Sequence, residues 1–333
     1  MNEASTGYPD LIAAATAVLV AEQSVSISLL QRKFRLDYND ALPLMDTLEK
    51  RGVVSAPHFN RFRTLTPAYM KPLATTPDMS KREKHIRRVF ETALFLWEAH
   101  EEGQGGNTNA IRILSPYGNN ANTRQQRNVV FTTLDHAPHR SLLTATSALA
   151  NWLPHDRQGT VDHGDIMDEL TALCLAENRG YQRITDREEK IERSYVRLAR
   201  YIRRILTEDA PPNTEIFLHF IPNEFVPRGK GKNGSGWDEH VVPRKYHLQA
   251  CLELFKGGWT IEDVARILRC SLTVVPITVE QSALLDSSLG NGGLGLKETM
   301  PDGWRIGIDC IYARLHKANI EFEPASETAA CTC

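Results

Sequence analysis

Hydrophobic residues near the N-terminus recur at intervals of three and four positions, which is the spacing of amphipathic helices. The first stripe predicts a helix over 10–22 and consists of Leu11, Ile12, Ala15, Val18 and Leu19. A second helix is predicted over 28–35, where Leu30 and Phe34 share one face. A third helix ends at Gly52, and its stripe consists of Ala41, Leu44, Met45 and Leu48.

A ribbon of two short strands is predicted after the third helix. Val53–Val54 begins one strand, and residues 61–66 alternate as the returning strand after a turn at 57–60. Three short helices closed by a two-stranded ribbon form the plan of a winged helix, so we expect such a domain over 10–66. Residues 67–79 contain three prolines and no periodicity, and they predict a linker.

The pattern beyond the linker is mostly helical. Helical periodicity is found over 81–97, 141–153, 166–176, 184–206, 246–255, 260–268 and 307–318. Strands are expected over 110–114, 128–134 and 216–221. The predicted fold class is mostly α with minor β. It combines an N-terminal winged helix with a larger, mainly helical α+β domain of unknown family over 80–320, and residues 321–333 are predicted to be a flexible tail.

One run of the sequence resembles a known family. Residues 28–54 read SLLQRKFRLDYNDALPLMDTLEKRGVV. This run resembles the gamma domain of the bacterial DNA translocase FtsK, a winged helix at the end of a chromosome-segregation motor. The matching positions are Ser28, Leu29, Leu30, Gln31, Arg32, Lys33, Phe34, Arg35, Tyr38, Asn39, Ala41, Leu44, Asp46, Leu48, Glu49, Gly52 and Val53. The resemblance covers about residues 10–66, and it implies that the domain binds duplex DNA by reading a short sequence in the major groove with its third helix.

The third helix departs from the family pattern at its start. The family has a Gly-Tyr-Asn-Arg type of run with a further arginine three residues on, and the corresponding residues here are Asp37, Tyr38, Asn39, Asp40 and Pro43. Asp40 therefore stands where a guanidinium would bind guanine, although a carboxylate accepts a hydrogen bond from cytosine N4. Because proline inside a helix removes a hydrogen bond, we expect the helix to begin with Asp40 as its N-cap rather than at Tyr38. The resemblance thus implies the fold without the family's sequence specificity.

The motor of a translocase is absent from this sequence. A phosphate-binding loop requires Gly, four residues and then Gly-Lys-Ser/Thr. The pairs Gly229-Lys230 and Gly231-Lys232 lack both the upstream glycine and the following hydroxyl. We therefore expect a winged helix that is attached to a different kind of body.

The charge and composition of the chain bear on which partners it can bind and on where in the cell it is expected. The 333 residues include 39 basic and 41 acidic side chains, so contact with nucleic acid depends on local patches. No apolar run approaches the roughly 18 residues of a membrane span, and the N-terminus lacks the pattern of a secretory signal. None of the six cysteines forms a Cys-x-x-Cys pair. We therefore expect reduced thiols and a cytoplasmic location.

Basic residues surround the predicted recognition helix. The residues that we expect to contact DNA are Arg32, Lys33, Arg35, Asn39, Asp40, Arg61, Arg63, Lys81 and Arg82. Most of the basic ones would hold phosphates, while Asn39 would lie near a base edge. The alternative is a solvated basic surface that binds no DNA. Two further segments, 197–204 and 228–237, are open to the same two interpretations.

Two segments outside the winged helix carry other signals. Residues 260–271 resemble the first helix and turn of a helix-turn-helix with Thr260 as N-cap, but Pro276 would break the next helix, so a simple amphipathic helix is favoured. One polar stretch has residue types that bind metal, namely His155, Asp156, Asp162, His163 and Asp165. Their spacing matches no known site, so a surface loop is favoured, and we predict no metal and no cofactor.

These observations favour a DNA-binding protein over an enzyme. We expect sequence-specific binding of double-stranded DNA in a bacterium or its mobile element, where the protein regulates transcription or organises plasmid or phage replication or maintenance. A homodimer would supply the affinity that one small module lacks. Two alternatives stay open: a metal-dependent DNA-processing enzyme targeted by the winged helix, and a protein-interaction adaptor whose winged helix is degenerate.

Overall fold

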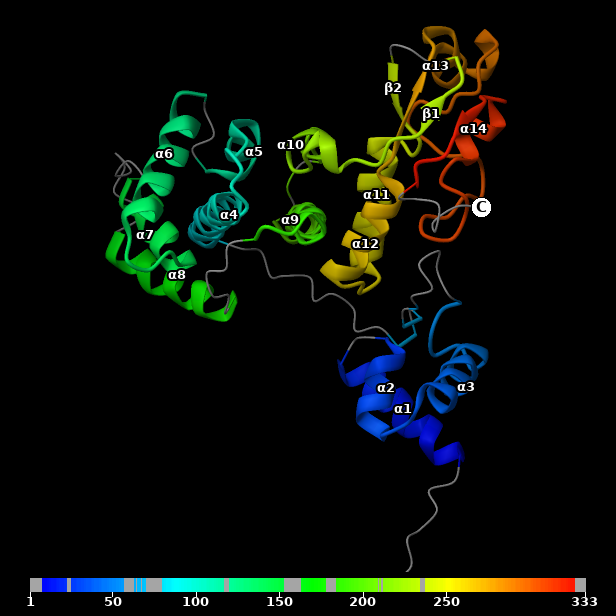
Figure 1. The fold of residues 1–333 in the computed structure, drawn as a ribbon, viewed down its shortest axis with the longest axis horizontal. Coiled ribbons are helices and arrows are strands. Elements are labelled where there is room, and N and C mark those ends of the chain that lie inside the picture. Colours follow the sequence, from blue (N-terminus) through cyan, green and yellow to red (C-terminus); the bar gives the residue numbers. More distant parts are fainter. Residues whose placement is uncertain are drawn as a thin grey trace, which may run out of the picture. The chain divides into compact units, whose positions relative to one another are not determined.

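The structure is a computed structural model of the chain. It describes residues 8–22, 25–56, 63, 65–66, 68–69, 80–116, 120–152, 163–177, 184–208, 210, 212–233 and 237–326. Contacts within the chain divide it into two compact units, Thr75–Phe225 and a unit that combines Met1–Ala74 with Val226–Cys333. The division after Phe225 falls inside the segment 80–320 that was predicted as one domain. The described residues are mostly helical with a few short strands (Figure 1), which confirms the predicted fold class.

The N-terminal segment forms three helices around one hydrophobic core. These are α1 (Tyr8–Glu22), α2 (Ile27–Phe34) and α3 (Tyr38–Lys50), joined by short connections (Figure 1). Ser26 caps α2 by accepting a hydrogen bond from the Leu29 N–H at 3.0 Å. The buried core positions are Ile12, Ala15, Leu19, Leu29, Leu30, Ala41, Leu44, Met45, Leu48, Val53, Val54 and Leu65. The hydrophobic stripes predicted from the sequence therefore face this core.

A short β-bridge closes the three helices. Val54 pairs with Leu65 in antiparallel orientation, and the Thr66 N–H donates to the Val53 carbonyl at 3.0 Å. The residues of the predicted ribbon and linker that lie outside the described part are 57–62, 64, 67 and 70–79. As far as it is described, the segment has the helices and the paired strand ends that a winged helix requires.

The start of α3 corrects one expectation. The helix begins at Tyr38 with Asp37 as N-cap, and the Asp37 carboxylate accepts a hydrogen bond from the Asp40 N–H at 2.9 Å. Asp40 is therefore inside the helix and is not its cap. Pro43 also lies inside α3, where it lacks the N–H that would bond to the Asn39 carbonyl. Both of these residues are exposed, and the Asp37 side chain satisfies one N–H of the first turn, so α3 begins at Tyr38 although Pro43 lies inside it.

The unit Thr75–Phe225 is a bundle of helices. Its elements are α4 (Lys81–Glu101), α5 (Thr108–Leu114), α6 (Asn120–His136), α7 (Leu142–Trp152), α8 (His163–Glu177), α9 (Arg187–Glu208), α10 (Ile216–His219) and the 3₁₀ turn η1 (Asn223–Phe225). α4 contacts α5, α6, α7 and α8, and it carries the fully buried Trp97. Ser80 and Glu83 form a capping box that begins α4.

Three segments that were predicted as strands contain helices. Residues 110–114 belong to α5, residues 128–134 belong to α6, and residues 216–221 begin with the short helix α10. Val130 and Leu134 are fully buried and lie four positions apart, so they share one helix face. A short apolar run fits a buried helix as well as a strand, and packing within the bundle decided for the helix.

Residues 226–326 form a segment of helices and short strands with its own hydrophobic core. Its elements are β1 (Lys230–Gly231), β2 (Trp237–His240), α11 (Arg244–Lys256), α12 (Ile261–Ser271), β3 (Val274–Ile277), α13 (Val279–Asp286), η2 (Leu289–Asn291), α14 (Ala313–Lys317) and β4 (Phe322–Glu323). β2 pairs antiparallel with β3, and β1 pairs antiparallel with β4. The core includes Val242, Val275, Ile277, Leu285, Ile311 and Leu315.

This segment decides between the two interpretations of residues 260–271. Thr260 caps α12, because its side chain accepts a hydrogen bond from the Asp263 N–H at 3.1 Å. The residues that follow form β3, which includes Pro276, so the hypothesis of a second helix-turn-helix is wrong and the single amphipathic helix is confirmed. The helix predicted over 307–318 is formed only at α14.

The basic loop contacts the C-terminal strand. Lys230 and Lys232 form exposed ion pairs with two glutamates at β4, which lies within the predicted tail 321–333. Residues 234–236 of the loop and 327–333 of the tail lie outside the described part. The two lysines are therefore paired on the surface in this structure.

Membrane and cysteine expectations can be compared with the described residues. No single described helix is both long and apolar enough to cross a membrane, and α1 with α2 reaches that length and composition only across a bend of 117°. Cys174, Cys251 and Cys270 are free and buried. Cys310 is disulfide-bonded, which corrects the expectation of a reduced thiol at this position.

Candidate nucleic-acid interface

The solvent-facing side of α3 is the candidate interface. Asn39, Pro43, Asp46 and Lys50 follow one another at spacings of four, three and four, so they share the face opposite the buried stripe. Asn39, Pro43 and Lys50 are exposed, and the Asp46 side chain is 48% exposed. One face of α3 is therefore accessible to a partner along its whole length.

The first turn of α3 is acidic. Asp40 is exposed, and one oxygen of the Asp37 carboxylate is occupied by the cap to the Asp40 N–H. Carboxylates suit this position in the helix because the partial positive charge of the helix dipole lies there. The same carboxylates repel a phosphate, whereas the amino group of cytosine attracts them. This end of α3 is thus suited to a base edge rather than to the DNA backbone.

The second half of α3 is tied to the wing. Arg63 Nη2 lies 2.8 Å from Asp46 Oδ1, and Arg63 Nη1 lies 2.7 Å from Glu49 Oε2. The Arg63 side chain is only 13% exposed. The guanidinium that was predicted to hold a phosphate is therefore bound to two carboxylates of α3 in this structure.

α2 presents basic side chains to solvent. Arg32 and Lys33 of α2 and its C-cap residue Arg35 are all exposed. Arg32 Nε donates to the Ser28 carbonyl at 3.3 Å, and Lys33 Nζ lies 2.8 Å from a carboxylate oxygen of Glu22. The Lys33 ammonium holds the pKa of the Glu22 carboxyl below its usual value. Since these contacts lie on the surface, they are easily exchanged for contacts with a phosphate.

The structure does not test the remaining predicted contacts, Arg61, Lys81 and Arg82. Arg61 lies outside the described residues. Lys81 and Arg82 are the first residues of α4 and belong to the other compact unit. Lys81 is exposed, and Arg82 is paired with Glu169 of α8. Their contact with DNA stays a prediction.

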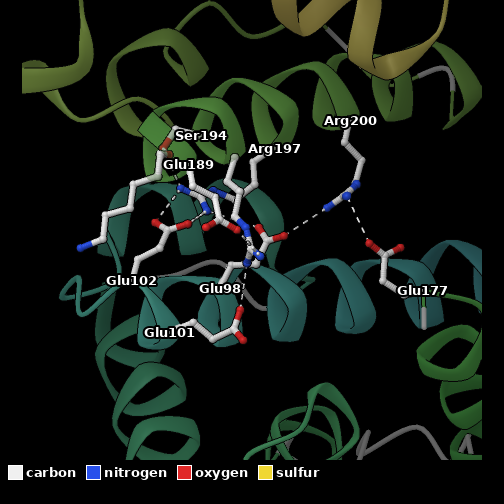
Figure 2. Close-up of polar contacts among 10 residues, drawn as sticks. Glu98, Glu101, Glu102, Glu177, Glu189, Ser194, Arg197 and Arg200 are labelled. Atoms are coloured by element: carbon white, nitrogen blue, oxygen red, sulfur yellow. Dashed lines mark hydrogen bonds and ion pairs between the residues drawn. The ribbon is translucent and has the colours of Figure 1, made fainter. Parts of the chain in front are cut away.

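Three of the arginines over 197–204, namely Arg197, Arg200 and Arg204, are largely buried inside the helical unit. Arg197 contacts Glu98 of α4 and Glu102, the C-cap residue of that helix, and Figure 2 shows this cluster between α4 and α9. The other pairs of the cluster are Arg193–Glu101, Arg200–Glu177 and Arg204–Glu208. Arg197, Arg200 and Arg204 are therefore bound to carboxylates within the helical unit, which contradicts a second DNA or partner surface formed by these three. The acidic partners of Arg197 lie 95 and 99 positions away, so its sequence neighbours do not reveal them.

The candidate metal ligands are not tested by the described residues. His155, Asp156 and Asp162 lie outside the described part, as do the side chains of His163 and Asp165. Within the described residues, no group of three or more His, Cys, Asp or Glu side chains is placed to hold a metal ion. The metal-dependent enzyme stays a hypothesis.

Three helices, a closing β-bridge and an accessible third helix define a winged-helix domain at the N-terminus. Residues 8–66 match the family model of the Ftsk gamma domain, which is a DNA-binding winged helix, and this confirms the resemblance seen in the sequence.

Two curated relatives match the same region. The DNA translocase FtsK of Listeria monocytogenes is 52% identical over 44 residues, which cover 13% of this chain and 6% of that protein. The DNA translocase FtsK of Lactiplantibacillus plantarum is 44% identical over 48 residues, which cover 14% of this chain and 6% of that protein. The chain thus spans only a small part of the length of the relatives that it matches. No solved structure gives a significant match.

Three residues at this interface were not among the predicted contacts: Asp46, Glu49 and Lys50. The position of Asp46 and Lys50 on the face of Asn39 follows from helical spacing, so the sequence carried that signal. The sequence carried no signal for the pairing of Glu49 and Asp46 with Arg63, because Arg63 lies 14 and 17 positions away from them.

Proposed function

We propose that the chain binds double-stranded DNA through residues 8–66, with α3 in the major groove. The match of this segment to a DNA-binding winged-helix family carries the proposal. The accessible face of α3 supports it, because Asn39 is suited to an adenine edge. Arg32 and Arg35, exposed on and next to α2, are suited to the flanking phosphates.

The finer role that we propose is sequence-specific regulation of transcription, or organisation of plasmid or phage replication or maintenance, in the bacterial cytoplasm. The sequence supports a role other than translocation because its two Gly-Lys pairs do not form a phosphate-binding loop. A homodimer belongs to this proposal, since one small module binds DNA with limited affinity. Sedimentation of the full chain tests it: a monomer at micromolar concentration, with and without duplex, would contradict the dimer.

The charge of α3 favours a second candidate function, a protein-interaction adaptor. The helix carries Asp40, Asp46 and Glu49 against Lys50, so three negative charges and one positive charge give a net charge of −2. A helix with this charge is repelled by phosphates unless neighbouring residues compensate. An adaptor would show no affinity for duplex DNA even at low salt.

Binding of the full chain to a randomised duplex pool at two salt concentrations, followed by sequencing of the retained DNA, separates the two candidates. The DNA-binding function predicts enrichment of one motif and weaker retention at higher salt. Arg32→Gln is expected to weaken binding to all sequences and to reduce the salt slope by about 1. Lys256→Gln on α11 is the matched control and is expected to change neither. If no duplex is retained at low salt, the proposal is wrong and the adaptor remains.

A further inference from the structure

Arg63 joins the wing to the recognition helix through two separate carboxylates. Its two terminal nitrogens lie 2.8 Å from Asp46 Oδ1 and 2.7 Å from Glu49 Oε2. A guanidinium is planar and its donors point in fixed directions, so these two bonds hold it in one orientation. The Arg63 side chain is 13% exposed, whereas the side chains of Asp46 and Glu49 are 48% and 33% exposed.

The two carboxylates lie where a duplex would approach α3. Asp46 shares the outward face of the helix with Asn39 and Pro43, and Glu49 follows Asp46 by three positions, so the two are neighbours on the helix surface. When α3 lies in the major groove, a carboxylate without a counter-ion on this face would be repelled by the phosphates of the duplex. With the one positive charge of Arg63 added, the net charge of −2 on α3 becomes −1.

Arg63 differs from Lys33 of α2, which also has an acidic partner. The Lys33 side chain is 48% exposed and has one carboxylate partner, Glu22, which is itself 45% exposed. A phosphate can replace that partner at little cost. A phosphate that bound Arg63 would have to displace two carboxylates from a mostly buried guanidinium and would leave both of them uncompensated.

We propose that Arg63 is an internal counter-ion of the recognition helix. It offsets one of the two negative charges of Asp46 and Glu49 so that α3 can approach the negatively charged duplex, and it holds no phosphate itself. In this role Arg63 is a positioning residue, and the inference rests on the DNA binding proposed above. It also explains how a domain that matches a DNA-binding family can carry a recognition helix with a net negative charge.

The experiment measures binding of the full chain to a labelled duplex of random sequence at two salt concentrations, by fluorescence anisotropy. Arg63→Met exposes two carboxylates and is expected to weaken binding at low salt by about tenfold. The triple variant Arg63→Met, Asp46→Asn, Glu49→Gln lacks the guanidinium but also lacks the charges that need it. We expect it to bind at least as tightly as the wild-type chain and with the same salt slope.

The comparison between the triple variant and the wild-type chain decides the role of Arg63. A triple variant that binds more weakly than wild type, with a salt slope reduced by about 1, would show that Arg63 holds a phosphate and would overturn the inference. Unchanged binding by a folded Arg63→Met chain would overturn it as well. The triple variant contains no unpaired charge at this site, so the comparison holds even if Arg63→Met alone fails to fold. A wild-type chain that binds no duplex at low salt would instead contradict the proposed function.

Discussion

The Arg197 guanidinium and the Glu102 carboxylate form a two-point ion pair inside the helical unit. Nη1 lies 2.5 Å from Oε1, and Nη2 lies 3.2 Å from Oε2 (Figure 2). The two side chains are 5% and 0% exposed. Burial acts to lower the pKa of Arg197, but Glu102 and Glu98 raise it above its usual value, so the guanidinium stays charged. The pair links α9 to the end of α4. Arg197 without Glu102 would keep the longer contact to Glu98 at 3.3 Å, and Glu102 without Arg197 would be buried without compensation.

Replacement of Glu102 by glutamine is therefore expected to destabilise the helical unit by about 3 kcal/mol or more. Urea unfolding of the full chain measures this loss, and hydrogen exchange in α4 and α9 assigns it to the unit. Glu215→Gln is the matched control: Glu215 lies 3.7 Å from Arg112, and both side chains are largely exposed. The control is expected to cost less than about 1 kcal/mol. Equal losses for the two variants would show that the buried pair contributes no more than a surface pair.

The cap of α3 allows helix stability and charge to be separated. Asp37→Ala removes the acceptor of the Asp40 N–H and is expected to destabilise α3 by about 1 kcal/mol. Asp37→Asn keeps an acceptor and removes a negative charge, so we expect unchanged stability and tighter binding of duplex DNA at low salt. Hydrogen exchange in α3 and anisotropy with a labelled duplex measure the two effects. If the asparagine variant is as unstable as the alanine variant, the charge of Asp37 stabilises the helix rather than its hydrogen bond.

Asp40 is expected to oppose phosphate contact and to favour a cytosine. Asp40→Asn should increase affinity for random-sequence duplex at low salt, and the gain should shrink at high salt as the charges are screened. On the motif selected from the randomised pool, the same variant should lose its preference for cytosine at one position. Glu262→Gln, an exposed carboxylate on α12, is the control. Asp40→Asn that changes neither affinity nor preference would place Asp40 away from the DNA.

His247 is expected to make the segment 226–326 sensitive to acid. It is fully buried, its Nε2 lies 2.8 Å from Ser271 Oγ, and burial lowers its pKa from 6.5 to about 3. In the unfolded chain His247 takes up a proton as the pH falls through 6.5, whereas in the folded chain it stays neutral until the pH approaches 3. The contribution of neutral His247 to the free energy of unfolding is therefore complete above pH 6.5. It is lost as the pH falls toward 3, at about 1.4 kcal/mol per pH unit.

The variant His247→Gln is expected to reduce the pH dependence of unfolding by one proton between pH 4.5 and 6. Burial also lowers the pKa of His240, to about 4, so part of the dependence should remain. Urea unfolding at several pH values measures the slope. His316→Gln, which changes an exposed histidine on α14, is the control. Equal slopes for the wild-type chain and His247→Gln would contradict the assignment.

The winged helix was determined by the sequence alone, because its signals are local. The spacing of apolar residues in each helix depends only on that helix, and residues 28–54 carry the family resemblance in one uninterrupted run. The cap at Thr260 was visible for the same reason. Residues 128–134 were not determined in this way: their apolar run suits a strand or a buried helix, and only their neighbours in the bundle decided.

Only the tertiary structure decided which charged side chains form ion pairs with one another. Arg63 and Arg197 both lie in stretches that look like basic surface, yet one is bound to carboxylates of α3 and the other to carboxylates at the end of α4. Ion pairs have no period along the chain, and these partners lie between 14 and 99 positions apart. Because a charge interacts with whatever the fold brings within a few ångströms, the role of each arginine follows from the folded chain and not from its neighbours in the sequence.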